Sequence, residues 1–181
     1  MKYAYNDGGR RDSGRMGSAG DCVCRAIAIA SGKPYAEVYA ALAQHAGNER
    51  KSRGKSARNG IHTSRRWFKS YMRGLGFRWF ACMGIGTGCK VHLTDGELPA
   101  GRLVVAVSKH YTAVVDGVIH DTHDPQREVA MFRQFPGWRI APLKPGEQRN
   151  HNGIFTVARR CVYGYWEYLP AGTFAATGPG A

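Results

Sequence analysis

Apolar positions near the start of the chain follow a helical repeat. In the stretch CVCRAIAIAS, Cys22, Ala26 and Ile29 are spaced i, i+4 and i+7, so they share one face of a helix. The pattern predicts a helix of about ten residues that begins at Cys22, and Asp21 stands where a side chain can cap its first turn. Residues 1–20 show no periodicity and are expected to form an arm leading into this helix.

Two further helices are predicted. The first covers YAEVYAALAQHA, because Pro34 suits its first turn and Gly47 its end. The second begins at about Thr63, with Thr63 or Ser64 as its cap, and ends at one of two glycines, Gly74 or Gly76. Its predicted core face carries three residues at i, i+4 and i+8, which are Trp67, Tyr71 and Leu75.

After residue 76 the apolar positions alternate, which is typical of strands. Strands are predicted over 77–82, 103–107, 111–115, 118–121, 154–157 and 162–168. The Asp-Gly pair in VVDGVI predicts a hairpin with a two-residue turn, because both positions of such a turn need a positive φ angle. Helices followed by an antiparallel sheet give an α+β fold, and residues 170–181 are expected to form a flexible tail.

The length of 181 residues suits one domain with a substantial core, so residues 1–181 are interpreted as a single domain. Five cysteines are an odd number, and the first fifteen residues are polar. Secretion, a disulfide framework and a membrane span are therefore not expected, and the thiols are predicted to be reduced in a cytoplasmic protein.

The chain carries a large excess of positive charge. The chain has 26 Lys and Arg against 13 Asp and Glu, a formal net charge of +13, which favours anionic partners. Residues 48–60 hold five basic residues and no aliphatic side chain larger than alanine, which predicts a solvated basic loop. The candidates for binding nucleic acid or an acidic protein are Arg50, Lys51, Arg53, Lys55, Arg58, Arg65, Arg66, Lys69 and Arg73.

Two sequence blocks carry a family resemblance. The first is DCVCRAIAI from Asp21, in which an Asp-Cys pair opens a helix of small residues, and the second is HYTAVVDGVIHD from His110. The chain resembles the papain-like cysteine peptidase superfamily, and among its members it is most similar to bacteriocin-leader peptidases. Small phage-encoded proteins of unassigned role also look similar, including the CVYGYW segment, which would place the protein in a bacterial host cytoplasm.

The resemblance implies a Cys-His-acid site with Cys22 as nucleophile and His110 as base and acid. A helix start and a neighbouring imidazolium both favour a thiolate, whereas Cys24 lies about 200° around the helix. Papain-like enzymes usually have an oxyanion-binding glutamine a few residues before the cysteine, where this chain has MGS at 16–18. Substitutes would have to come from Asn6, Ser13, Ser18 or another residue, and without one the site is expected to be slow or inactive.

The hairpin register selects the acid that orients His110. With Asp116-Gly117 as the turn, Val115 pairs with Val118 and Ala113 with His120, and Asp121 then lies diagonally from His110 on the same face. Asp121 is therefore predicted to be the orienting residue. Asp124 is the alternative, and it requires the strand to end or bulge before Pro125.

These residues predict a cysteine hydrolase that acts on a peptide or isopeptide bond of a protein substrate, without a cofactor. The alternative is a non-catalytic basic protein of the same fold that binds nucleic acid or a host factor. A zinc site could be drawn from Cys22, Cys24, His120 and His123, but Cys-x-Cys is not the usual spacing of a structural zinc site, so no metal is expected.

Overall fold

A computed structural model describes residues 1–47, 56–126, 128–134, 137–141 and 155–169. The predicted tail at 170–181 lies outside these residues. The same is true of residues 48–55, which include Arg50, Lys51, Arg53 and Lys55. The described end of the basic loop is not simply solvated, because Ser56 and Gly60 close a tight turn and Ala57 between them is buried.

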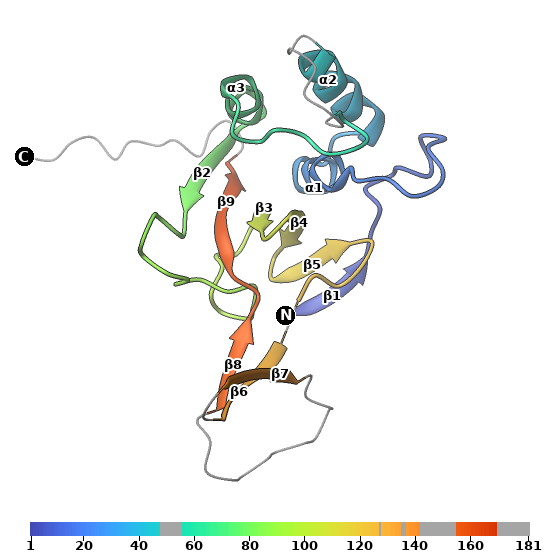
Figure 1. Ribbon diagram of the computed structural model, residues 1–181. Helices are drawn as coiled ribbons and strands as arrows, with labels where there is room; N and C mark the ends of the chain where they lie inside the picture. The colour runs from blue at the N-terminus through green and yellow to red at the C-terminus, as the bar shows by residue number, and fades with distance from the viewer. Residues whose placement is uncertain (48–55, 127, 135–136, 142–154, 170–181) are drawn as a thin grey trace, which may run out of the picture.

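Three helices pack on a six-stranded mixed sheet, which makes the fold α+β (Figure 1). The helices are α1 (Cys22–Ser31), α2 (Tyr35–Gly47) and α3 (Arg66–Gly74). The sheet has the order β1-β5-β4-β3-β9-β2, with bounds Lys2–Tyr5, Val118–Asp121, His110–Val115, Arg102–Val107, Val162–Tyr168 and Phe77–Ala81. A second sheet, β7-β6-β8, has bounds Gly137–Ala141, Glu128–Gln134 and Phe155–Arg159.

Both faces of the central strands are buried. Val104, Ala113 and Trp166 face the helices and join a core with Val23 and Ile27 of α1. The opposite face has its own core, formed by the strand residues that point away from the helices and by Leu93 of the segment after β2. The strand residues are Leu103, Val105, Val107, Val114, Ile119 and Val162. Strand β3 is buried on both faces, which is why its sequence RLVVAV is continuously apolar after its first residue.

The prediction that residues 1–20 form only an arm is wrong. Residues Lys2–Tyr5 form strand β1, which pairs in parallel with β5, so the sheet is mixed rather than purely antiparallel (Figure 1). Tyr3 lies opposite Ile119, and the amide of Asn6 donates to the carbonyl of Asp121. A four-residue strand whose partner lies far along the chain leaves too short a pattern to be recognised in sequence.

The predicted helices are confirmed with one shift. Helix α1 begins at Cys22 and α2 ends at Gly47, as the sequence indicates. Helix α3 begins at Arg66 rather than near Thr63, and its N-cap residue is Arg65 instead of Thr63 or Ser64. Its fully buried face is formed by Phe68 and Met72, whereas the predicted residues Trp67, Tyr71 and Leu75 are only partly buried at its margin.

The predicted hairpin is confirmed in its turn and its register. Asp116 and Gly117 have φ angles of 48° and 77°, and Val115 pairs with Val118. Ala113 pairs with His120, as the count from the turn requires. Strands β6 and β7 were not predicted, and β8 covers 155–159 rather than 154–157.

The expectation that all thiols are reduced is wrong. Cys89 and Cys161 form a disulfide with a Cα–Cα distance of 5.8 Å, and Cys22, Cys24 and Cys82 are free. The bridge ties the segment after β2 to the residue that precedes β9. An odd cysteine count indicates only that at least one thiol is unpaired, and it cannot show which residues the fold brings together. Among the described residues, no helix is long and apolar enough to cross a membrane.

Candidate active site

The start of helix α1 and the start of strand β4 meet at one end of the main sheet. Cys22 is the first residue of α1, and His110 is the first residue of β4. Both side chains are partly buried and line a cleft of about 1120 Å³. Helix α1 packs along β4 through Ala26 and Ala113 in the shared core, which holds the two starting residues at the same end of the domain.

His110 is oriented by Asp121 from the neighbouring strand. Nε2 of His110 lies 2.6 Å from Oδ2 of Asp121, and Asp121 is almost fully buried. The ring also interacts with the Cys22 thiol, and each of the two groups shifts the pKa of the other. Because Nε2 is occupied by the carboxylate, Nδ1 is the ring nitrogen left to face the thiol.

Asp121 has a second role in the local structure. Its Oδ1 accepts a hydrogen bond of 2.7 Å from the amide of Thr122, so the same carboxylate caps the turn after β5 and orients His110. Asp124, the alternative orienting acid, is exposed and accepts a hydrogen bond from the amide of Gln126 instead. Of the two candidate acids, Asp121 is therefore the one that contacts the imidazole.

The surroundings favour charge separation between the thiol and the imidazole. Burial alone would raise the pKa of the Cys22 thiol, but the hydrogen bond and charge of His110, the amide of Tyr111 and the charge of Arg25 lower it. Burial alone would lower the pKa of His110, yet its bonds to Asp121 and Cys22 raise it to about 9. The pKa of Asp121 is lowered, because contact with His110 and the Thr122 amide outweighs burial.

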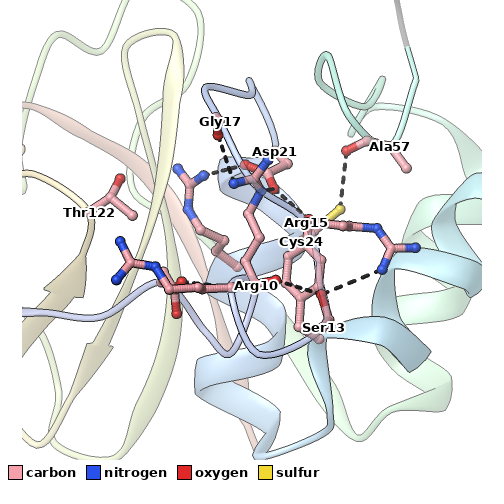
Figure 2. A network of polar contacts seen from close by, with 12 residues as sticks. Arg10, Ser13, Arg15, Gly17, Asp21, Cys24, Ala57 and Thr122 are labelled. Atoms are coloured by element: carbon pink, nitrogen blue, oxygen red, sulfur yellow. Dashed lines mark hydrogen bonds and ion pairs between the residues drawn. The ribbon is translucent and has the colours of Figure 1, made fainter.

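The surroundings of the other two free thiols raise their pKa values instead of lowering them. The Cys24 thiol is fully buried and donates to the carbonyl of Ala57 at 3.3 Å (Figure 2). Burial raises the pKa of Cys24 to about 12, helped by the negative charge of Asp21. Burial also raises the pKa of Cys82. Of the three free cysteines, all of which lie in the described part of the chain, Cys22 is thus the one whose pKa is lowered.

Asp21 does not cap α1 with its side chain, contrary to the prediction. Its carboxylate is buried and bonded to the guanidinium groups of Arg10 and Arg25 and to the Tyr35 hydroxyl, the last at 2.5 Å (Figure 2). Two guanidinium groups and a hydroxyl bind the Asp21 carboxylate more strongly than the free backbone amides of the first helical turn could. Arg10 also donates to the carbonyls of Met16 and Gly17 and so holds the segment before α1.

Sequence reasoning missed Arg25, which lies at the centre of this buried network. Its guanidinium bonds to Asp21 one turn earlier, and it lies 4.0 Å from Oδ1 of Asp121. The guanidinium therefore lies between the carboxylate beside the helix start and the carboxylate that orients His110. The sequence signal for this contact was the i, i+4 spacing of Asp21 and Arg25 at a helix start. Such pairs are more common on exposed helix faces, so the spacing alone did not indicate a buried ion pair.

The proposed oxyanion substitutes differ in position. The Ser13 hydroxyl donates to the Arg10 carbonyl at 2.6 Å, and the Asn6 amide oxygen accepts from the Gly8 amide, so both are engaged away from the cleft. Ser18 does line the cleft, as do Cys22 and Val23 at the first turn of α1. Amides of that first turn and the Ser18 hydroxyl are therefore the available donors.

The described part of the basic stretch lies apart from this site. Helix α3 and the turn before it present five exposed cations, none of which lines the cleft: Arg58, Arg65, Arg66, Lys69 and Arg73. On α3 the side chains of Arg66, Lys69 and Arg73 are exposed, as predicted, but they do not lie directly opposite the buried Phe68 and Met72, because the buried face differs from the predicted one.

The four-residue zinc set is not assembled, because the Cys24 thiol is buried against Ala57. A different group could hold a metal ion: the ligand atoms of His110, Asp121 and His123 lie within 4.8 Å of one another. A metal bound there would occupy the imidazole that faces Cys22, so metal binding and acid–base use of His110 are mutually exclusive.

Comparisons of the chain with protein-family models, curated proteins and solved structures found no match.

Proposed function

We propose that the protein is a cysteine-dependent hydrolase that cleaves a peptide or isopeptide bond. The observation that carries this proposal is the imidazole of His110, which is hydrogen-bonded to Asp121 through Nε2 and also interacts with the thiol of Cys22. A nucleophile, a base and a group that orients the base, each within hydrogen-bond reach of the next, form the arrangement that acyl transfer requires.

The order of elements supports a papain-like fold for the domain. A helix that begins with the cysteine precedes the sheet strand that begins with the histidine, and the acid follows on the next strand. The lack of any match to a solved structure leaves the papain-like assignment as a proposal that rests on this order.

The chemistry divides into two acyl-transfer steps. The Cys22 thiolate attacks the carbonyl carbon, a C–S bond forms, and the oxyanion is held by amides of the first turn of α1. The C–N bond then breaks, and the amine leaves with the proton from the His110 imidazolium. Water next gives a proton to His110 and its oxygen to the acyl carbon, the C–S bond breaks, and the acid is released.

A proteome-derived peptide mixture provides the direct test. The wild-type protein should generate new peptide ends that mass spectrometry identifies, and the Cys22→Ala protein should not. Cys82→Ala is the matched control, since Cys82 is a free thiol that does not line the cleft. New ends that persist with Cys22→Ala would contradict the proposed nucleophile.

The thiols should differ in their reactivity with pH. Alkylation of Cys22 is expected to proceed at pH of about 6–7, because its pKa is lowered, whereas Cys24 and Cys82 have raised pKa values and should stay unlabelled. The thiolate–imidazolium pair should persist until the pH approaches about 9, where His110 loses its proton. The His110→Ala variant should shift Cys22 labelling to higher pH.

Peptide mapping after timed alkylation measures these rates residue by residue. Cys82 is the unactivated control, because it is a free thiol outside the cleft, whereas Cys89 and Cys161 are paired in the disulfide. Equal labelling of Cys22 and Cys82 at a pH of about 6 would show that Cys22 is not activated.

A second candidate function is supported by the exposed cations of α3. A non-catalytic protein of this fold could bind nucleic acid or an acidic host factor through Arg65, Arg66, Lys69 and Arg73. The side chains stand along one helix and could follow a phosphate backbone.

Nucleic-acid binding at this face should depend steeply on salt. Fluorescence anisotropy with single- and double-stranded oligonucleotides should give a log–log slope of about −0.7 to −0.9 per phosphate contact. Reversal of charge at Arg65 and Arg66 should weaken binding to every sequence alike. Lack of binding to either form at low salt would remove this candidate.

A further inference from the structure

The cleft around Cys22 is rich in positive charge. Five arginine or lysine residues line it, which are Arg10, Arg11, Arg15, Arg25 and Lys109. Asp7 is the single carboxylate among the described residues of the lining, and its two oxygens accept from the amides of Gly9 and Arg11.

Three of these five cations are engaged within the protein. Arg10 and Arg25 are bonded to the buried carboxylate of Asp21. The guanidinium of Arg15 lies 4.1 Å from the centre of the Tyr39 ring. In the part of the chain that the structure describes, Arg11 and Lys109 have no ion-pair partner, and both side chains are exposed. They are therefore available to a ligand.

Lys109 has a backbone conformation that is unusual for a residue other than glycine. Lys109 directly precedes His110 in the turn between β3 and β4, and its φ angle is 58°, in the region that favours glycine. Glycine would suit this turn at lower conformational cost, yet a lysine that lines the cleft stands there. Lys109 therefore lines the cleft directly next to His110 in the chain.

Apolar side chains accompany the two cations. Tyr5, Met16 and Tyr163 line the cleft although they are 65%, 66% and 39% exposed. In the sheet order, Tyr5 on β1 and Tyr163 on β9 lie on opposite sides of β4, which carries His110. Large apolar groups left exposed around a cleft are typical of a surface that binds a ligand.

We propose that the cleft binds an acidic peptide segment, in which a carboxylate pairs with Lys109 and Arg11 and a large apolar side chain contacts Tyr5 or Tyr163. This inference rests on the proposed function, because it names the substrate class of the same site. The carboxylate can belong to an aspartate or glutamate side chain or to a peptide C-terminus, and both present the same group to the cations.

Peptide selection on the full-length Cys22→Ala protein tests this binding without requiring catalysis. A randomised decapeptide library, prepared with free and with amidated C-termini, is incubated with immobilised protein, and retained peptides are sequenced by mass spectrometry. Retained peptides should contain Asp or Glu beside an aromatic or large aliphatic residue, enriched about fivefold to tenfold over the library, as two partly exposed ion pairs would produce. Enrichment confined to free C-termini would identify the terminal carboxylate as the bound group.

Variants of the two cations assign the effect to this cleft. Lys109→Glu and Arg11→Glu, each in the Cys22→Ala background, should abolish the enrichment, whereas Lys90→Glu, at an exposed lysine outside the cleft, should leave it unchanged. Lys109→Gly removes the charge at a position whose backbone suits glycine, so its loss of enrichment cannot come from misfolding of the turn.

The outcomes separate this inference from the proposed function. Retained peptides without acidic enrichment, or enrichment that survives Lys109→Glu, would overturn it even if the wild-type protein cleaves peptides. Binding of a single-stranded oligonucleotide that displaces the peptides and is lost with Lys109→Glu would assign the cleft to nucleic acid and overturn it too. Acidic enrichment in the absence of cleavage by the wild type would support the inference and contradict the hydrolase.

Discussion

Replacement of Cys22 by alanine is expected to lower peptide cleavage by about 10⁴-fold or more, because the covalent route is lost with the nucleophile. Replacement of His110 by alanine should lower it by about 10³-fold, since both the proton donor and the imidazolium that stabilises the thiolate are removed. The measurement is kcat/KM on a peptide that the wild-type protein cleaves. Removal of both side chains together should lower kcat/KM little more than removal of the Cys22 side chain alone, because the two groups act as a unit.

Two controls make this result specific to the site. Cys82→Ala removes a free thiol outside the cleft and should retain the full rate. His45→Ala removes an imidazole that stacks on Trp67 and takes no part in the site, so it should retain most of the rate. A rate that falls equally in His45→Ala and His110→Ala would show that the loss reflects stability rather than chemistry.

Replacement of Asp121 by alanine is expected to lower the rate by about 10²-fold or more, because the imidazole of His110 loses the group bonded to Nε2. Asp124→Ala should have little effect, since that carboxylate is exposed and bonded to Gln126. Asp121→Asn should recover part of the rate, because its amide oxygen can still accept the Nε2 proton.

The pH profile separates orientation from mere stability. The Asp121 carboxylate helps to raise the pKa of His110 to about 9, so the neutral amide introduced by Asp121→Asn should move the alkaline limb of the profile to lower pH. A structural role alone would lower the rate without moving that limb. Circular dichroism should show folded protein for each variant, and a greater loss in Asp124→Ala than in Asp121→Ala would contradict the assignment.

Local pattern was sufficient for the elements that carry the site. The i, i+4, i+7 spacing after Asp21 places Cys22 at the start of α1, and the Asp116-Gly117 turn places Asp121 one strand away from His110. Both inferences depend on short-range rules, the period of a helix and the alternation of a hairpin, which hold whatever the rest of the chain does. The contact between His110 and Asp121 follows from them.

Helix α3 shows where local pattern fails. Trp67, Tyr71 and Leu75 have helical spacing, yet Phe68 and Met72 face the core, because one step along a helix turns the buried face by about 100°. Two adjacent apolar stripes are present, and the place of α3 against Trp166 of the sheet decides between them.

By itself, the sequence determined the α+β order of elements, the helix that begins at Cys22 and the hairpin that faces Asp121 toward His110, since each arises from residues close together in the chain. Only the tertiary structure decided the features that join distant residues. These are the pairing of β1 with β5, the bridge between Cys89 and Cys161, and the burial of Asp21 between Arg10, Arg25 and Tyr35. The physical reason is that these partners meet through packing of the whole domain, and apart from the i, i+4 spacing of Asp21 and Arg25 the spacing along the chain carries no record of them.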